Sequence, residues 1–433
     1  MNKIFILLFT ILAVPCCWLL SQAEDRVQKI SSGSVVIKKV KNNYQLYRNG
    51  EPYYIKGAGG YAYYEQLKQR GGNSVRLWST VGAGEYLDKA HQLGLTVTLG
   101  LDMKLERHGF NYDDKKAVRE QFEMLKKEIL AFKDHPALLM WGVGNEVDQF
   151  AKNYNVWNAV NEIARFIHDV DPNHPTTTML AGVPRAHIKE IIKRCPDIDV
   201  LAINAFKWIV PVKADITSAG WEGPYLIGEW GASGYWETDT VPWGAFIEET
   251  STEKAQACAA RYEKAIRSNT DRCLGSYVFY WGYKQARTHT LLSLFLESGE
   301  ATGVLDFLQK EWTGKMPVNS APLIVQIGID DKLTHLGIYL SPGSNHMAFT
   351  DASDPDKDSL WYKWEIYPES TEKKEGGDKE EKPAAIDGLI ADGNGKQLLF
   401  KAPEKEGPYR LFVYVFDGHN HVATANAPFR VRR

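Results

Sequence analysis

Two glutamates in this 433-residue chain have the type and placement for acid–base chemistry. Glu146 ends the segment WGVGNE at 141–146, and Glu229 follows the apolar run 225–228. Two carboxyl groups in different surroundings acquire different pKa values, so one can donate a proton while the other attacks or activates water. Cleavage of a glycosidic bond requires this division of roles. An Asn-Glu dipeptide arises by chance about once in a chain this long, and Glu229 alone could be a salt-bridge partner, so only the coincidence of the two positions is informative.

The elements that must position these glutamates alternate between strand-like runs and amphipathic helices up to about residue 316. Apolar residues recur at three- and four-residue steps over 115–133, 156–170 and 252–268, which predicts helices, the last capped by Ser251. A hairpin over 34–48 precedes them. The predicted strands are 53–58, 74–78, 96–101, 138–142, 176–180, 200–204, 225–228 and 276–280.

Eight strands separated by helical or loop crossovers predict a (β/α)8 TIM barrel, an α/β fold. The alternative is a doubly wound open sheet with a phosphate-binding turn after its first strand. The segment KGAGG at 56–60 is rich in glycine but lacks the G-x-G-x-x-G spacing, which favours the barrel. Catalytic groups of such barrels lie at the C-terminal ends of the strands, so Glu146 and Glu229, after the fourth and seventh strands, would share one mouth.

These motifs resemble a known group of enzymes. Asn145-Glu146 after the fourth strand and Glu229-Trp230 after the seventh are similar to the clan of retaining glycosidases that includes families 2 and 5, over about 53–281. The resemblance implies that Glu146 is the acid/base and Glu229 the nucleophile of a double displacement. It also implies that Asn145 binds the sugar hydroxyl beside the anomeric carbon. Retaining pairs stand about 5–5.5 Å apart.

The same resemblance implies further roles and shows one gap. Arg76 would hold the charge of the nucleophile, and Trp281 would form the floor of the −1 subsite. Family 5 enzymes usually carry His and Tyr after the sixth strand, where this chain has Asn204-Ala205-Phe206. The segments GGNSVR at 71–76 and GNEV at 144–147 resemble β-1,3-glucan-active members, above all bacterial endo-β-1,3-glucanases with an immunoglobulin-like C-terminal domain. β-1,3-Glucan is therefore the expected substrate.

Other residues are candidates for binding substrate, each with a structural alternative. Glu106 and His108 follow the third strand on a loop, where functional residues concentrate. His108 could bind a sugar hydroxyl or pair with a neighbouring carboxylate, and Asn204 could bind substrate or loop backbone. Trp208 and Trp236 fall in predicted loops and are the tryptophans best placed to stack on sugar rings.

Two other functions fit the same residues. A transglycosylase would use the same two carboxylates but pass the sugar to an acceptor sugar. A non-catalytic carbohydrate-binding protein could keep the barrel without its chemistry, although the presence of both glutamates argues against it.

The remaining chain, 317–433, contains only strand-like runs and turns, which predicts an antiparallel, immunoglobulin-like β-sandwich beside a barrel domain at 24–316. The charged segment TEKKEGGDKEEK at 371–382 is interpreted as a solvated loop. The aspartates at 351–358 indicate a turn, the alternative being a calcium loop, which would need glycine where Ser359 stands. The predicted strands are 323–328, 336–340, 361–367, 397–400, 409–416 and 427–431.

The N-terminal segment and the overall composition limit the expected location and partners of the protein. Lys3, the apolar run 4–20 and the small-residue site at 21–23 predict a signal peptide over 1–23, hence a secreted, periplasmic or cell-surface protein without a stable membrane span after cleavage. A net charge of −3 does not favour a nucleic-acid partner. The expected partner is a polysaccharide or oligosaccharide, and no metal or organic cofactor is implied. Three cysteines outside 1–23 leave either a Cys258–Cys273 pair or buried thiols.

Overall fold

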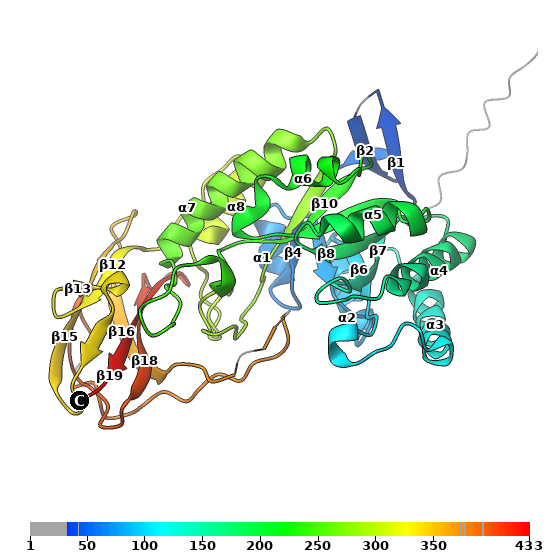
Figure 1. Cartoon of the computed structure of the whole chain (residues 1–433). Helices are drawn as coiled ribbons and strands as arrows, with labels where there is room; N and C mark the ends of the chain where they lie inside the picture. Colours follow the sequence, from blue (N-terminus) through cyan, green and yellow to red (C-terminus); the bar gives the residue numbers. More distant parts are fainter. Residues whose placement is uncertain (1–32, 42, 373, 376, 392–393) are drawn as a thin grey trace, which may run out of the picture.

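A computed structural model describes residues 33–433 except 42, 373, 376 and 392–393, so the predicted signal peptide lies outside the described residues. Eight parallel strands close into a barrel in the order β10-β11-β4-β5-β6-β7-β8-β9. Figure 1 shows this barrel with its surrounding helices at the right and a strand-rich unit at the left. The predicted TIM barrel with a C-terminal all-β unit is therefore confirmed.

The barrel strands match the predicted runs within a few residues. The strands could be recognised in the sequence as continuous apolar runs because both of their faces are buried. Side chains on the inner face pack on one another inside the barrel, and those on the outer face pack on the helices. The eighth strand is displaced the most: it was expected at 276–280 but begins at Cys273. The strands are β4 Ile55–Gly59, β5 Ser74–Leu77, β6 Thr96–Leu101, β7 Leu138–Asn145, β8 Thr176–Ala181, β9 Val200–Asn204, β10 Tyr225–Trp230 and β11 Cys273–Val278.

The helices cover the outside of the barrel with their apolar faces. The first two predicted helices are present as α3 and α4, but the third ends early as an α-helix and continues as a π turn over Tyr262–Ile266. Its cap is Thr250 rather than Ser251, since the Thr250 hydroxyl accepts from the Glu253 amide and Glu253 accepts in return from the Thr250 amide. The helices are α1 Tyr64–Gln69, α2 Ala83–Gln92, α3 Lys115–Phe132, α4 Asn155–Val170, α5 Arg185–Arg194, α6 Val212–Ser218, α7 Ser251–Arg261 and α8 Val304–Thr313.

The N-terminal hairpin closes the end of the barrel opposite the mouth. β1 Val35–Val40, β2 Asn43–Arg48 and β3 Glu51–Tyr53 form an antiparallel sheet. Its Val35 and Leu46 are buried in one cluster with barrel-interior residues such as Met140 and Leu226. Apolar side chains thus seal this end, leaving the mouth for polar chemistry.

The C-terminal unit consists of two four-stranded sheets, β13-β12-β15-β17 and β14-β19-β18-β16, which bury a shared apolar core. α8 ends at Thr313 and β12 begins at Leu323. The expectation of purely antiparallel pairing is wrong at one edge, where β14 pairs parallel to β19. The strands are β12 Leu323–Ile329, β13 Lys332–Leu333, β14 Ile338–Leu340, β15 Asn345–Ser353, β16 Trp361–Pro368, β17 Gln397–Lys401, β18 Gly407–Phe416 and β19 Val422–Val431.

Strand β15 was not predicted, because the residues that it turns to the core are small. Ala348, Thr350 and Ala352 are its buried positions, and Phe349 and Asp351 stand between them. The aspartate-rich stretch after it forms the expected turn, in which Asp354 accepts from the amides of Asp356 and Asp358.

A long segment between β16 and β17 leaves this unit and reaches the barrel (orange in Figure 1). The interpretation of 371–382 as a solvated loop is wrong for several of its residues. Asp378 bonds to Arg107, and Glu380, only 6% exposed, bonds to Arg287. We call the described residues Glu372, Lys374, Glu375, Gly377, Asp378, Lys379 and Glu380 the strap.

Cys195, Cys258 and Cys273 are free and buried, so the proposed Cys258–Cys273 pair does not form. Within 33–433, apart from the undescribed positions, no helix combines the length and apolarity needed to cross a membrane.

Candidate active site

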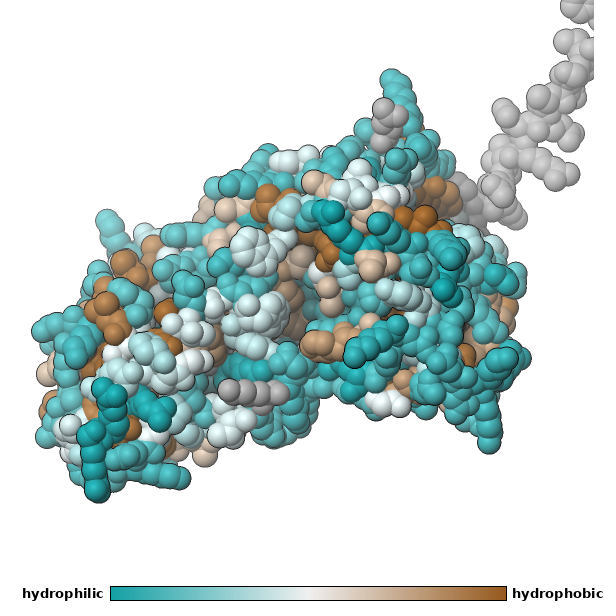
Figure 2. Space-filling view, viewed as in Figure 1, coloured by the Kyte–Doolittle hydropathy of each residue, from teal (hydrophilic) through white to brown (hydrophobic). Residues whose placement is uncertain are grey.

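A cavity of about 880 Å³ lies at the C-terminal mouth of the barrel, lined by both Glu146 and Glu229. The face seen in Figure 2 is mostly hydrophilic and is hollowed near its centre, between the barrel and the two-sheet unit. The volume falls in the upper part of the range of about 300–1,000 Å³ common for small-molecule sites. The two glutamates predicted to cooperate therefore share one space.

The carboxylate of Glu229 accepts hydrogen bonds from two donors, one on β5 and one on the residue that follows β5. Arg76 Nη1 donates to Glu229 Oε1 over 2.9 Å, and the Trp78 indole N–H donates to the same oxygen over 2.9 Å. Arg76 is only 1% exposed, so this charged pair is shielded from water. A guanidinium and an indole N–H can only donate, which favours the ionised carboxylate.

Glu146 stands in different surroundings. β7 ends immediately before it, and its φ of 50° turns the chain sharply out of the strand. Asn204 Nδ2 donates to Glu146 Oε1 over 2.9 Å. Burial, and then the negative charge of Glu229, raise the pKa of Glu146 from the usual 4.5 to about 7. Glu146 can therefore hold a proton near neutral pH while remaining close to a charged partner.

An amide network joins the two glutamates. Arg76 donates to the side-chain oxygens of Asn145 and Asn204, and Asn204 Nδ2 also reaches Asn145 Oδ1 over 3.2 Å. Asn204 thus contacts both the arginine that holds Glu229 and the carboxyl of Glu146. Of the two alternatives for Asn204, binding loop backbone is not what the structure shows, since its side chain bonds within the site.

The predicted sugar platforms divide into two groups. Trp208 and Trp236 line the cavity and are 66% and 55% exposed, so both side chains are accessible from the cavity. Trp281 is 1% exposed, and its indole N–H donates to the Tyr63 carbonyl. The expectation that Trp281 forms the subsite floor is wrong, because a buried ring has no face to offer; Tyr280 lines the cavity instead.

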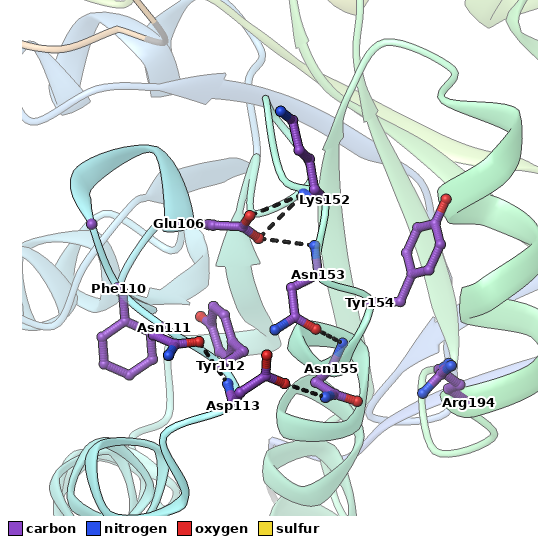
Figure 3. A pocket seen from close by; sticks show the side chains of 11 residues that line it. Glu106, Phe110, Asn111, Tyr112, Asp113, Lys152, Asn153, Tyr154, Asn155 and Arg194 are labelled. Atoms are coloured by element: carbon purple, nitrogen blue, oxygen red, sulfur yellow. Dashed lines mark hydrogen bonds between the residues drawn. The ribbon is translucent and has the colours of Figure 1, made fainter.

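His108 and Glu106 do not line this cavity. His108 Nε2 lies 3.1 Å from Asp378, so the structure shows the carboxylate pair rather than an open sugar donor, and the partner belongs to the strap. Glu106 accepts from the backbone amides of Lys152 and Asn153, which ties the loop after β6 to the loop after β7 (Figure 3). Glu106 borders a separate surface hollow of about 720 Å³.

Sequence reasoning did not select several residues of the cavity. Trp78 could have been found, because it lies two positions after Arg76 at the same strand end and therefore points to the same side. Tyr61 and Lys284 follow β4 and β11, and only their places at strand ends hint at a role. The strap residues carry no signal, since a run of charges normally indicates solvent exposure.

Residues 84–233 match the family model described as glycosyl hydrolases family 2, TIM barrel domain. The match contains Glu146 and Glu229 and covers about a third of the chain. No curated protein sequence matches this chain significantly.

Solved structures share the fold at low identity. A β-glucuronidase from Ruminococcus gnavus, in complex with C6-substituted uronic isofagomine, superposes with a TM-score of 0.50 and 14% identity, over 65% of this chain and 52% of that one. An FMN-binding β-glucuronidase from Facaelibacterium prausnitzii L2-6 gives a TM-score of 0.49 and 14% identity, over 92% of this chain and 59% of that one. This chain thus spans a little over half the length of the proteins it resembles. The first likeness concerns the fold alone.

Proposed function

We propose that this protein is a retaining glycosidase that cleaves β-glycosidic bonds by double displacement. Glu229 is the nucleophile and Glu146 the acid/base. The observation that carries the proposal is the unequal treatment of two carboxyls in one cavity: Arg76 and Trp78 bond to Glu229, whereas burial keeps a proton on Glu146 up to a pH of about 7. The family match over 84–233 supports the same reaction class.

In the first step Glu229 attacks the anomeric carbon while Glu146 gives its proton to the departing oxygen. The bond to the leaving sugar breaks, and a covalent glycosyl-enzyme forms. Once Glu229 is esterified, the charge that helped to raise the pKa of Glu146 is gone. Glu146 then takes a proton from water, whose oxygen attacks the anomeric carbon and releases Glu229.

The substrate is proposed more narrowly as β-1,3-glucan, on the resemblance of the segments 71–76 and 144–147. The cavity volume and the exposed Trp208 and Trp236 support binding of several sugar units rather than one. We also propose that the chain is exported, because 1–23 has the layout of a signal peptide.

The test is hydrolysis of a panel by the purified protein: 4-nitrophenyl β-glycosides, β-1,3- and β-1,4-glucans, mannan, xylan and galactan. We expect release of reducing ends from at least one polymer. Products longer than the substrate at high oligosaccharide concentration would indicate a transglycosylase. Binding without release of reducing ends would indicate a carbohydrate-binding protein.

The roles are tested by Glu229→Ala, which should abolish turnover and regain part of it with azide, because azide can enter the space of the missing carboxylate and attack the anomeric carbon. Glu222→Ala is the matched control, since this exposed glutamate lies shortly before the same strand. Unchanged activity of Glu229→Ala would remove Glu229 from the nucleophile role.

A further inference from the structure

The strap is fastened to the barrel mouth at two places. At one, Arg107 forms a two-armed pair with Asp378, at 3.1 and 3.2 Å, and His108 adds a third contact. Both barrel residues belong to the loop after β6. An arginine that meets a carboxylate with two N–H groups fixes its direction as well as its position.

At the other place the strap meets the loops after β10 and β11. Arg287 Nη1 donates to Glu380 Oε1 over 2.6 Å and to the Glu372 carbonyl over 2.9 Å. Both members of the Arg287–Glu380 pair are buried, with side chains 9% and 3% exposed. Lys284 Nζ donates to the Gly377 carbonyl, and the Tyr235 hydroxyl donates to Glu375.

These two places lie almost opposite each other on the barrel. In the closed order, β4 and β5 separate β11 from β6 on one side, and β7, β8 and β9 separate β6 from β10 on the other. Glu372 and Glu380 both bond to Arg287, while Asp378 between them bonds to Arg107, so the strap forms a loop that spans the mouth from the β11 side to the β6 side; we call this line its chord. All strap residues named above except Glu372 and Lys379 line the cavity, so the chord is one of its walls.

The cavity is developed unequally on the two sides of this chord. Among the described residues, those from the loops after β4 and β5 that line it are Tyr61 and Trp78 alone. The ends of β7, β8 and β9 and the segments that follow them contribute three separate groups of lining residues, within 145–150, 181–183 and 204–215. The last group includes Trp208. Apart from the residues of and after β10 and β11, where the strap is fastened, the barrel thus lines the cavity mainly from β7–β9.

The roles proposed for the two glutamates indicate which side of the cavity binds each part of the substrate. The proton of Glu146 goes to the leaving oxygen, so the leaving part of the glycan lies beside Glu146, which follows β7. The part that stays on Glu229 then extends away from β7, toward β11 and β4. The strap, tied by Lys284 to the loop after β11, lies on that path.

We propose that the strap closes the glycone end of the cavity, so that the protein removes a mono- or disaccharide from the non-reducing end of a β-linked glycan. This inference rests on the proposed glycosidase function and specifies it. The specificity-determining residues are Glu375, Gly377 and Asp378 of the C-terminal unit together with Lys284 of the barrel. The C-terminal unit is accordingly part of the substrate site.

The test uses the hexasaccharide of whichever panel glycan is cut fastest, which is laminarihexaose if that glycan is β-1,3-glucan. The hexasaccharide is labelled at its reducing end, and the first labelled products are identified. We expect a labelled product one or two units shorter, and a slow fall in the viscosity of the polymer relative to the release of reducing ends. A ladder of labelled products from the earliest times would overturn the strap proposal alone. Absence of any hydrolysis would remove the glycosidase function and the strap proposal with it.

Two variants loosen the strap without touching the two glutamates. Arg287→Ala removes the buried fastening and Arg107→Ala the more exposed one, so at least the second should fold, as checked by thermal denaturation. We expect the share of internal cuts to rise several-fold, with KM changing more than kcat. Lys379→Ala is the control, because its side chain is 85% exposed and it does not line the cavity. Unchanged products in a folded Arg107→Ala and Arg287→Ala would overturn the proposal.

Discussion

Replacing Glu146 by glutamine should stabilise the folded protein in alkaline solution at the expense of its activity. The glutamine keeps the shape of the side chain and an oxygen that accepts from Asn204 Nδ2. It never ionises, whereas the carboxyl of Glu146 must carry a buried charge near Glu229 above its pKa of about 7. The substitution therefore removes an electrostatic cost of folding that catalysis requires.

The size and sign of this effect follow from the two pKa values. Glu146 ionises near pH 4.5 in the unfolded chain and near pH 7 in the folded protein. The folded state therefore binds the extra proton, and its stability falls as pH rises between these values. The fall amounts to about 3 kcal/mol, since each pKa unit corresponds to about 1.4 kcal/mol. Below pH 4.5 and above pH 7 this contribution is constant.

The assay is urea denaturation of the wild type and Glu146→Gln at several pH values from 4 to 8.5. We expect the free energy of unfolding of the variant to gain about 3 kcal/mol on the wild type between pH 4.5 and 7. Glu222→Gln, at an exposed position, should show no such trend. In a Glu229→Gln background the gain should shrink, because the neighbouring charge contributes to it. A difference between variant and wild type that does not change with pH would refute the reasoning.

Three further predictions concern rate and stability. The pH profile of kcat/KM should decline above about pH 7, where Glu146 loses the proton that it must donate; a flat alkaline limb up to pH 9 would contradict this. Trp78→Phe removes one donor to Glu229, which for a charged acceptor corresponds to about 1.5–3 kcal/mol, so kcat/KM should fall about 10- to 150-fold in steady-state assays. Glu248→Gln removes the negative charge that lies 2.6 Å from the buried ammonium group of Lys254 and should lower the free energy of unfolding by about 3–5 kcal/mol; a loss under 1 kcal/mol would show that the ion pair is not needed.

The barrel and its two glutamates could be predicted from the sequence because both depend on local pattern. Each strand is a short apolar run between turn signals, and the strand number fixes where its end lies on the mouth. Glu146 and Glu229 could be assigned to the mouth from their positions after the fourth and seventh strands alone. Asn145 and Arg76 followed by resemblance, and the structure places both in contact with the network around the glutamates.

What could not be predicted depends on contacts between distant parts of the chain. The position of Trp281 at a strand end suggests the mouth, but the ring turns toward Phe295 and Trp312 and is covered by them. His108 meets a carboxylate 270 positions away, and no local pattern encodes that distance. Burial of Glu380 likewise contradicts the usual behaviour of a charge run, since Arg287 supplies the compensating charge.

The difference between the two glutamates is a property of the residues around them rather than of the glutamates themselves. Arg76 donates a hydrogen bond to the carboxyl of Glu229, whereas on Glu146 its charge acts only through space and less strongly than burial. Glu146 receives instead a neutral amide from Asn204, which orients the carboxyl without supplying a positive charge. Roles in this site are therefore assigned by β5 and β9, and a search for such sites should look first for the arginine and the amide.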